Sequence, residues 1–213
     1  MNAQRAILIV AVALGIGYGW LRGAFLSADD RQPARAPAIQ RGMQKATFAS
    51  GCFWCTEADF DKVPGVQSTT SGYTGGRVKN PTYEQVSRGG TGHAEAVEVV
   101  FDPQRVTYER LLDHFWRNVD PFTGHRQFCD VGLQYRPEIF VHDAMQRATA
   151  EAALQKVRQR FSGPIAVKIT DAGEFYPAEE YHQDYYRKNP IQYRYYRWRC
   201  GRVARLREIW GRE

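Results

Sequence analysis

The feature that most constrains the fold is an irregular mixture of strand and helix patterns. Residues 93–102 alternate apolar and polar side chains, the pattern of a strand with one buried face. Thr107 then follows as an N-cap for an amphipathic helix over 108–119. Further elements are expected as strands at 45–50, 66–73, 139–141 and 165–169, and as helices at 52–63 and 144–161. Because strands and helices do not alternate strictly, the sequence predicts an α+β fold rather than a doubly wound parallel sheet.

The composition of the chain excludes several classes of protein. Its 213 residues, 43% hydrophobic and 24% charged, are typical of a globular protein and not of a collagen, a coiled coil or a disordered chain. Four cysteines are too few for a small disulfide-stapled scaffold. The segment 181–213 holds nine basic and three acidic residues, an excess equal to the whole net charge of +6, so no basic patch is expected over the rest of the fold.

The N-terminal region differs in character from the rest of the chain. Residues 6–21 carry no charge over sixteen positions, a length between that of a secretory hydrophobic segment and that of a membrane span. We predict a signal anchor or a cleaved signal peptide over 1–26 and a flexible tether over 27–44. The folded domain then covers 45–213 and ends in a basic, aromatic tail. Either form of the N-terminus places this domain outside the cytoplasm, membrane-anchored or exported to a compartment such as the periplasm.

The sharpest local motif is the cysteine pair within Gly51–Cys55. Glycine allows a sharp turn from a strand into a helix, so Cys52 is expected at a helix N-terminus. There the helix dipole and the unpaired amides would lower the pKa of its thiol and make the thiolate available as a nucleophile. Cys55 lies three residues further along the same helical face and could trap an oxidised Cys52 as a disulfide.

The motif alone leaves three further roles open for this pair. The two cysteines could form a structural disulfide or remain core thiols. A zinc site would need Cys129 and Cys200 or a histidine as further ligands, but these two cysteines do not form a second C-x-x-C. A thioredoxin-like redox protein would place the pair in a parallel strand–helix–strand series, which does not follow here.

A wider series of motifs accompanies the pair. In chain order after GCFW it consists of Gly72–Gly76, Asn80–Tyr83, Thr91–Glu95, Asp130–Gly132, Gln134–Arg136 and Phe175–Gln183. From about Lys45 to Pro190 the chain resembles the peptide methionine sulfoxide reductases of the A type. The resemblance implies a compact α+β sandwich or roll in two layers, with a mixed, mostly antiparallel sheet, flanking helices and much coil. It also implies reduction of the S epimer of methionine sulfoxide, free or in proteins, as repair of oxidative damage, with electrons from thioredoxin or a similar dithiol. No metal and no organic cofactor is expected.

The resemblance also assigns roles to seven residues of one site. They are the nucleophile Cys52, the methyl-pocket residues Phe53 and Trp54, the acid Glu95, the hydroxyl donors Tyr83 and Tyr135, and the supporting carboxylate Asp130. The chemistry asks for the same residue types. Oxygen leaves a sulfoxide poorly unless it is protonated, and a carboxylic acid whose pKa is raised by burial can supply that proton. Two tyrosine hydroxyls can orient the oxygen, and an apolar ring suits the S-methyl group.

The sequence departs from the commoner family pattern in its resolving cysteines. Many members have glycine at the position of Cys55 and carry resolving cysteines in a C-terminal tail. Here the tail has the single cysteine Cys200, and Cys129 lies beside Asp130. Three thiols are therefore candidates to condense with the sulfenic acid of Cys52. The tail analogy makes Cys200 the first choice, ahead of Cys55 and Cys129.

The aromatic, basic tail is expected to pack on the domain. Arginines interleaved with tyrosines can stack on nucleic acid, but we expect a closing helix packed by Tyr195, Tyr196 and Trp198, and no nucleic-acid partner. A short amphipathic helix is expected from Val203, Leu206, Ile209 and Trp210. A monomer is expected. The alternatives to the reductase are a general thiol–disulfide oxidoreductase and a module that binds oxidised methionine without turning it over.

Overall fold

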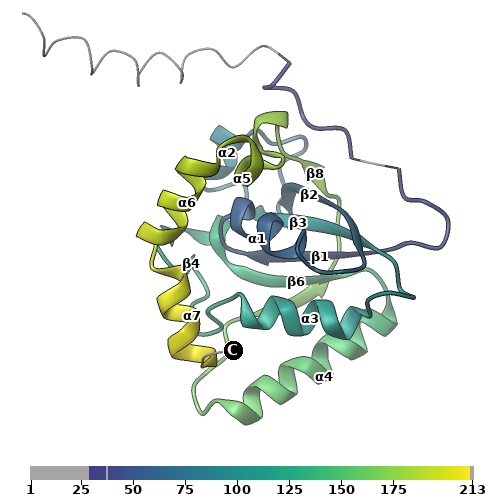
Figure 1. Cartoon of the computed structure of the whole chain (residues 1–213), viewed down its shortest axis with the longest axis vertical. Coiled ribbons are helices and arrows are strands. Elements are labelled where there is room, and N and C mark those ends of the chain that lie inside the picture. Colours follow the sequence, from purple (N-terminus) through teal and green to yellow (C-terminus); the bar gives the residue numbers. More distant parts are fainter. Residues whose placement is uncertain (1–28, 37, 212–213) are drawn as a thin grey trace, which may run out of the picture.

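The computed structural model describes residues 29–36 and 38–211. One six-stranded sheet organises the domain (Figure 1). Its strands, in spatial order, are β7 (Lys168–Asp171), β6 (Pro137–Val141), β1 (Gln44–Ser50), β3 (Ala94–Phe101), β2 (Val66–Thr74) and β8 (Tyr176–Pro177). All neighbouring strands pair antiparallel except β6 and β7, which are parallel. The predicted α+β class with a mixed, mostly antiparallel sheet is confirmed.

Helices flank this sheet, and short elements fill the connections between them. The helices are α1 (Phe53–Phe60), α2 (Tyr83–Ser87), α3 (Tyr108–Arg117), α4 (Ala144–Arg160), α5 (Tyr185–Lys188), α6 (Pro190–Arg199) and α7 (Arg202–Trp210), with 3-10 turns η1 (Leu133–Tyr135) and η2 (Glu180–His182). A small second sheet pairs β4 (Arg126–Gln127) with β5 (Asp130–Val131). The strand expected at 165–169 begins only at Lys168, because β7 takes its register from β6, where Glu138 pairs with Lys168.

The main core lies between the sheet and the helices α1, α3 and α4. Phe48 of β1 stacks on Phe60 of α1 and on Phe115 of α3, with ring centroids 4.9 and 5.4 Å apart. Side chains alternate along a strand, so the odd-numbered residues of β3 share the face that carries Val97. The hydroxyl of Thr107 accepts a hydrogen bond from the Arg110 amide, which confirms the predicted start of α3.

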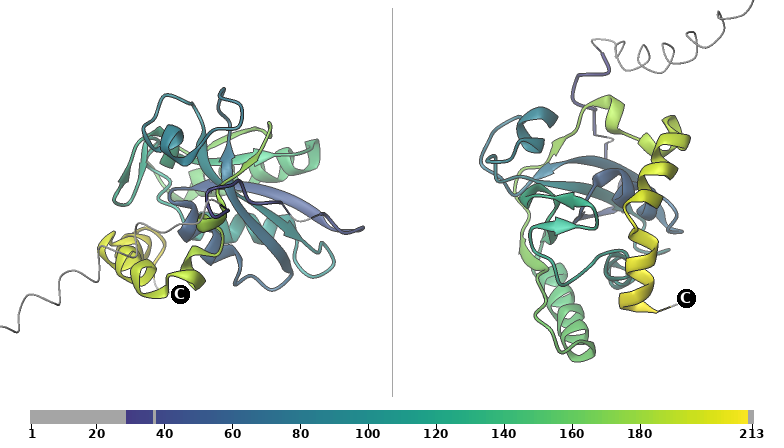
Figure 2. Two further views of the ribbon diagram at one scale, coloured as in Figure 1. Left: turned by 90° about the horizontal axis from the view of Figure 1, so that it is seen from above. Right: turned by 90° about the vertical axis from the view of Figure 1, so that its left-hand side faces the viewer.

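The C-terminal helices α6 and α7 run end to end along one side of the domain (Figures 1 and 2). The prediction that Tyr195 and Trp198 pack inward is wrong, because these side chains are 59% and 75% exposed. Val203 is exposed as well, and the residue that α7 buries is Arg202, which is 1% exposed. Its guanidinium donates to the carbonyl oxygen of Asn118 over 2.6 Å. From the sequence, apolar side chains were expected to anchor the C-terminal helices on the domain. In the structure the buried, charged side chain of Arg202 anchors α7 instead.

Asp59 is the counter-ion of this segment, and its charge supports a prediction of stability. Its carboxylate lies 2.9 Å from Arg197 and 3.5 Å from the buried Arg202. Replacing Asp59 with asparagine leaves both guanidinium groups without a counter-ion in a dry site, so we expect the free energy of unfolding to fall by about 3 kcal/mol in urea titration. The control Asp171→Asn removes an exposed carboxylate that pairs with Arg147, which keeps Glu151 as a second partner, and should change nothing measurable. Equal stability of the two variants would contradict the role given to Asp59.

The whole predicted N-terminal anchor or signal segment over 1–26, and residues 27, 28 and 37 of the predicted tether, lie outside the described residues. Within the described residues, no helix has the length and apolar character needed to cross a bilayer. Part of the predicted tether lies against the domain. The amide of Ala34 donates to the carbonyl of Ala178, and the amide of Glu180 donates to the carbonyl of Gln32.

Candidate active site

The turn between β1 and α1 sets the position of Cys52. Gly51 has a φ of +90°, and a Cβ atom there would lie 2.5 Å from the Cβ of Gln127. Only glycine meets both conditions without strain, so the chain can turn directly from strand into helix. Cys52 is the N-cap of α1, as the sequence predicts, and its side chain is 7% exposed.

Glu95 lies on β3 and faces the first turn of α1. Its Oε2 accepts a hydrogen bond of 3.0 Å from the amide of Phe53, which would otherwise be an unpaired donor at the helix start. The side chain is 2% exposed, and burial raises the pKa of Glu95 to about 8. The negative charge of Asp130 raises this pKa further, while the Phe53 amide lowers it. A proton donor is therefore held beside Cys52 at neutral pH, as the sequence predicts.

Tyr83 and Tyr135 approach the same carboxyl from two other segments. Tyr83 is the first residue of α2, whose start is fixed by a capping box between Thr82 and Gln85. Tyr135 ends the short turn η1. Burial, followed by the charge of the nearby Glu95, raises the pKa of each phenol well above its ordinary value. Both hydroxyls stay protonated and can donate hydrogen bonds to an oxygen held between them.

The two aromatic residues after Cys52 have different surroundings. Phe53 is buried, with its ring centroid 4.9 Å from His182 and 6.5 Å from Tyr83. Trp54 is half-buried, and its indole Nε1 donates to Nδ1 of His182 over 3.0 Å. Burial lowers the pKa of His182 to about 3, so the ring is neutral and Nδ1 accepts. One face of the Trp54 indole stacks on Tyr185 at 3.7 Å. The orientation of this indole is thus fixed by two residues of the C-terminal segment.

Asp130 connects the site to α6. The hydroxyl of Tyr196 donates to Asp130 Oδ2 over 2.5 Å, and the Tyr196 ring lies edge-on to Trp54 with centroids 5.9 Å apart. Burial raises the pKa of Asp130, and the Tyr196 hydroxyl lowers it in part. The structure therefore brings all seven residues predicted for the site around one point, with α6 as part of its wall.

Cys52 and Cys55 form a buried pair of free thiols. Burial raises the pKa of the Cys52 thiol well above its ordinary value, so the lowering expected from the helix dipole is wrong for Cys52 itself. A hydrogen bond from Cys52 lowers the pKa of Cys55 to about 7, and the charges of Arg202 and Arg197 lower it further. The first proton therefore leaves the pair near neutral pH, and the resulting charge is shared across a sulfur–sulfur hydrogen bond.

The other two cysteines form a disulfide. Cys129 and Cys200 are joined with their Cα atoms 4.9 Å apart and 71 residues apart in the sequence. This bond ties the small β4–β5 sheet to the junction between α6 and α7. The four cysteines are thus divided into an inner thiol pair and an outer disulfide, and they do not gather as one cluster of ligands.

Comparisons with known proteins agree with this geometry. A family model described as peptide methionine sulfoxide reductase matches residues 44–213. The chain belongs to the peptide methionine sulfoxide reductase family. Peptide methionine sulfoxide reductase MsrA of Bacillus licheniformis is 49% identical over 170 residues, which cover 79% of this chain and 94% of that protein. Relatives named MsrA place the chain in the A type.

A longer relative and a solved structure extend the comparison. The MsrA/MsrB protein of Vibrio cholerae is 47% identical over 190 residues, 88% of this chain, and the chain spans 50% of the length of that relative. The reduced form of Mxr1 from Saccharomyces cerevisiae superposes with a TM-score of 0.69 at 31% identity, covering 72% of this chain and 90% of that one. The fold is therefore that of the A-type reductases.

Three residues of the reductase site were missed or undervalued from the sequence. His182 lies in a recognised motif, Phe175–Gln183, but its hydrogen bond to the Trp54 indole could be seen only in the structure. Tyr196 was expected to pack inward but not to contact Asp130, and Tyr185 was not singled out within this aromatic-rich stretch. Which of these rings face the site depends on where α5 and α6 begin and end. The bounds of these two helices were not predicted from the sequence.

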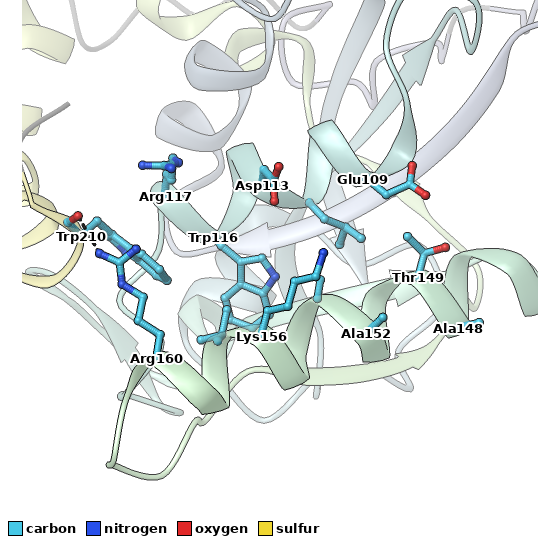
Figure 3. A pocket seen from close by; sticks show the side chains of 13 residues that line it. Glu109, Asp113, Trp116, Arg117, Ala148, Thr149, Ala152, Lys156, Arg160 and Trp210 are labelled. Carbon is cyan, nitrogen blue, oxygen red and sulfur yellow. Dashed lines mark hydrogen bonds between the residues drawn. The ribbon is translucent and has the colours of Figure 1, made fainter.

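A separate cleft of about 550 Å³ lies between α3 and α4 (Figure 3). Leu112, Trp116 and Val157 supply apolar lining, and Trp210 of α7 closes one end. None of the residues predicted for the reductase site lines this cleft, so we place the chemistry at Cys52 and not here.

Proposed function

We propose that the chain reduces the S epimer of methionine sulfoxide, free and in proteins, to methionine, with Cys52 as the nucleophile. One observation carries this proposal. Glu95, protonated up to about pH 8, is hydrogen-bonded at the first turn of the helix that Cys52 caps. A nucleophilic sulfur and a proton donor are therefore fixed at one helix end, and the proposed substrate position is between them.

The first step forms a sulfenic acid on Cys52. Its sulfur attacks the sulfoxide sulfur while its thiol proton passes to the Cys55 thiolate, which already accepts the hydrogen bond between the two sulfurs. Glu95 donates its proton to the sulfoxide oxygen, and the hydroxyls of Tyr83 and Tyr135 stabilise the charge that develops there. Methionine leaves, and the oxygen stays on Cys52 as a sulfenic acid.

The second step forms a disulfide between Cys52 and Cys55. The Cys55 thiol condenses with the sulfenic acid of Cys52 and releases water. We propose Cys55 rather than Cys200, the first choice from the sequence, as the resolving residue, and the hydrogen bond between the sulfurs of Cys52 and Cys55 supports this choice. Cys200 is bonded to Cys129 and has no free thiol in this state.

A reductant must then return the pair to thiols. A fold neighbour, Mxr1 from Saccharomyces cerevisiae, was solved in complex with Trx2. We propose a thioredoxin-like dithiol protein as the electron donor for this chain. Since the N-terminal sequence predicts an anchor or signal peptide, the proposed site of action is outside the cytoplasm, with an exported donor and a monomeric reductase.

The direct test is turnover of separate S and R epimers of an N-blocked methionine sulfoxide with excess dithiothreitol. We expect the S epimer alone to be reduced, because Glu95 and the two tyrosines approach the sulfoxide oxygen from a fixed side of the methyl pocket. Release of methionine is followed by chromatography. Turnover of the R epimer would contradict the assignment, and binding of S-sulfoxide with no turnover of either epimer would move the function to recognition alone.

The rate is expected to have a narrow optimum in pH. The thiol pair must lose one proton, so kcat/KM for the sulfoxide should rise as pH increases through about 7. Glu95 must keep its proton, so the same rate should fall as pH increases through about 8. Stopped-flow measurement of methionine release over this range tests both limbs. A rate that climbs steadily into alkaline solution would exclude Glu95 as the acid.

A further inference from the structure

We propose that Glu179 is a positioning residue of the sulfoxide site, a single carboxylate that holds Tyr83 in place and fixes the His182 tautomer that orients the Trp54 indole. The inference rests on the proposed function, in which Tyr83 donates to the sulfoxide oxygen and Trp54 lines the methyl pocket. Glu179 takes no part in the two chemical steps, and it is only 8% exposed. A carboxylate buried to this degree needs partners that replace its lost hydration.

The two oxygens of Glu179 join two segments that meet at the site. Oε1 accepts a hydrogen bond of 2.8 Å from the amide of Tyr83, the first residue of α2. The capping box of α2 satisfies the amides of Thr82 and Gln85, and Glu179 satisfies the amide of Tyr83 next to the cap. Oε2 accepts a hydrogen bond of 2.8 Å from the hydroxyl of Tyr73 on β2. Glu179 therefore fixes the backbone of Tyr83 relative to the sheet.

Glu179 also faces His182, three residues further along the chain. The 3-10 turn η2 begins after Glu179 and ends at His182, and side chains three residues apart in such a turn lie on one side. Oε2 of Glu179 lies 4.0 Å from Nε2 of His182. The carboxylate is therefore near one ring nitrogen of His182 while the other ring nitrogen contacts Trp54.

The hydrogen bond to Trp54 decides which nitrogen of His182 carries the proton. Burial lowers the pKa of His182, so the ring is neutral and has one N–H. An indole nitrogen can only donate, and Nδ1 accepts from it over 3.0 Å, so the proton is on Nε2. Among the described residues Nε2 has no hydrogen-bond partner. The nearby negative charge of Glu179 is then the interaction that favours a proton on this nitrogen.

The His182 ring connects the two halves of the site. Its centroid lies 4.4 Å from that of the Tyr83 ring and 4.9 Å from that of Phe53, and its Nδ1 holds Trp54. A change at Glu179 therefore reaches both the donor to the sulfoxide oxygen and the wall of the methyl pocket. A misplacement of about 1 Å in such groups can lower a rate by about a hundredfold.

The backbone around Glu179 is held by other groups. The amide of Ala178 donates to the carbonyl of Ser71 on β2 over 2.9 Å. The side-chain amide of Gln183 donates to the carbonyl oxygens of Ser71 and Ala178 over 2.9 and 3.0 Å. None of these bonds uses the Glu179 side chain, so its replacement should leave the segment in place.

The test replaces Glu179 with glutamine, which has nearly the same size but only one acceptor oxygen. If that oxygen stays on the Tyr83 amide, the NH2 group faces the Nε2 side of His182 and favours a proton on Nδ1. The opposite orientation would set two donors against each other at Tyr83. With its proton on Nδ1, His182 can no longer accept from Trp54.

Nitrogen NMR of the histidine ring reads this change directly. Wild-type protein should show His182 with a protonated Nε2 and an unprotonated Nδ1, and Glu179→Gln should show the reverse. The His182 signals are identified by their loss in His182→Asn. A carboxylate that served only packing would leave the tautomer unchanged.

Turnover of the S epimer with excess dithiothreitol should change together with the tautomer. For Glu179→Gln we expect kcat/KM to fall about 10- to 100-fold, with a higher KM because Trp54 is released and a lower kcat because Tyr83 is less firmly placed. Glu180→Gln is the matched control. Glu180 is the next residue, is exposed and pairs with Lys188 at 3.0 Å, so its replacement should change neither the tautomer nor the kinetics.

A second variant keeps the inference testable if the glutamine variant does not fold. Glu179→Asp keeps the charge but is one methylene shorter and cannot reach both Tyr73 and the Tyr83 amide, so the His182 tautomer should persist while kcat falls. A proton on Nδ1 of His182 in wild-type protein, or wild-type kcat/KM in Glu179→Gln, would overturn the inference. Wild-type protein that reduces neither epimer would instead sink the proposed function, and the tautomer measurement distinguishes the two because it needs no turnover.

Discussion

Replacing Cys52 with serine is expected to abolish reduction of methionine S-sulfoxide, by a factor on the order of 10⁴ or more. A serine hydroxyl at the N-cap of α1 has a far higher pKa than a thiol and cannot form the sulfenic acid that carries the oxygen away. Neither the buried Glu95 nor the two tyrosines can compensate, because they act on an oxygen that no nucleophile is displacing. The measurement is methionine release from the S epimer with excess dithiothreitol.

Two controls separate this effect from damage to the fold. Serine is nearly the same size as cysteine and is a preferred N-cap, so the free energy of unfolding should not fall. Cys129→Ser, tested in the same assay, removes an exposed sulfur outside the inner pair and should retain turnover with dithiothreitol. Residual turnover of Cys52→Ser within tenfold of wild type would mean that another thiol performs the attack.

Local sequence patterns predicted much of the frame that holds this site. Thr107 caps α3 through its hydroxyl, and the strand expected at 93–102 is present as β3, although both of its faces are buried where the alternation predicted one. These features depend on neighbours within a few residues, so they can be derived from the chain alone. The same is true of Gly51, since a sharp turn between strand and helix requires a backbone that only glycine adopts easily.

The parts that were not predicted depend on pairs of residues far apart in the sequence. Arg202 is buried because Asp59 and the Asn118 carbonyl receive it, and this ion pair turns Trp198 and Val203 outward against their hydropathy. The pKa of Cys52 follows its burial and its contact with Cys55 more than its place at a helix N-terminus. No local pattern contains the information on burial that decides these cases.

The disulfide between Cys129 and Cys200 is another contact between distant residues that local sequence patterns could not predict. Cys129 and Cys200 are separated by 71 residues, and the sequence ranked them as separate candidates for one role. The fold brings the β4–β5 sheet against the end of α6, and so makes them partners of each other. Pairing within the set of thiols, which decides the path of electrons, is therefore a property of the tertiary structure and not of the motif.

Replacing Glu95 with glutamine is expected to lower kcat for the S epimer by about 10²–10⁴-fold, the usual contribution of a general acid. Glutamine keeps an oxygen that can accept from the Phe53 amide, so the start of α1 and the position of Cys52 should be preserved. It has no proton to give to the sulfoxide oxygen. The loss should therefore fall on the first step, which single-turnover measurement of methionine release isolates from disulfide reduction.

The pH profile distinguishes this loss of a proton donor from a change in packing. Burial raises the pKa of Glu95 to about 8, so wild-type activity falls above that pH, and the variant should lose this alkaline limb along with most of its rate. Glu98→Gln is the matched control, since Glu98 lies on the same strand but on the opposite face and pairs with Lys45 at 3.0 Å. Glu98→Gln should leave the rate unchanged, and also the rise near pH 7 and the fall near pH 8 in the pH profile. If Glu95→Gln kept the alkaline limb, another group would have to supply the proton, and the hydroxyls of Tyr83 and Tyr135 would be the next groups to replace.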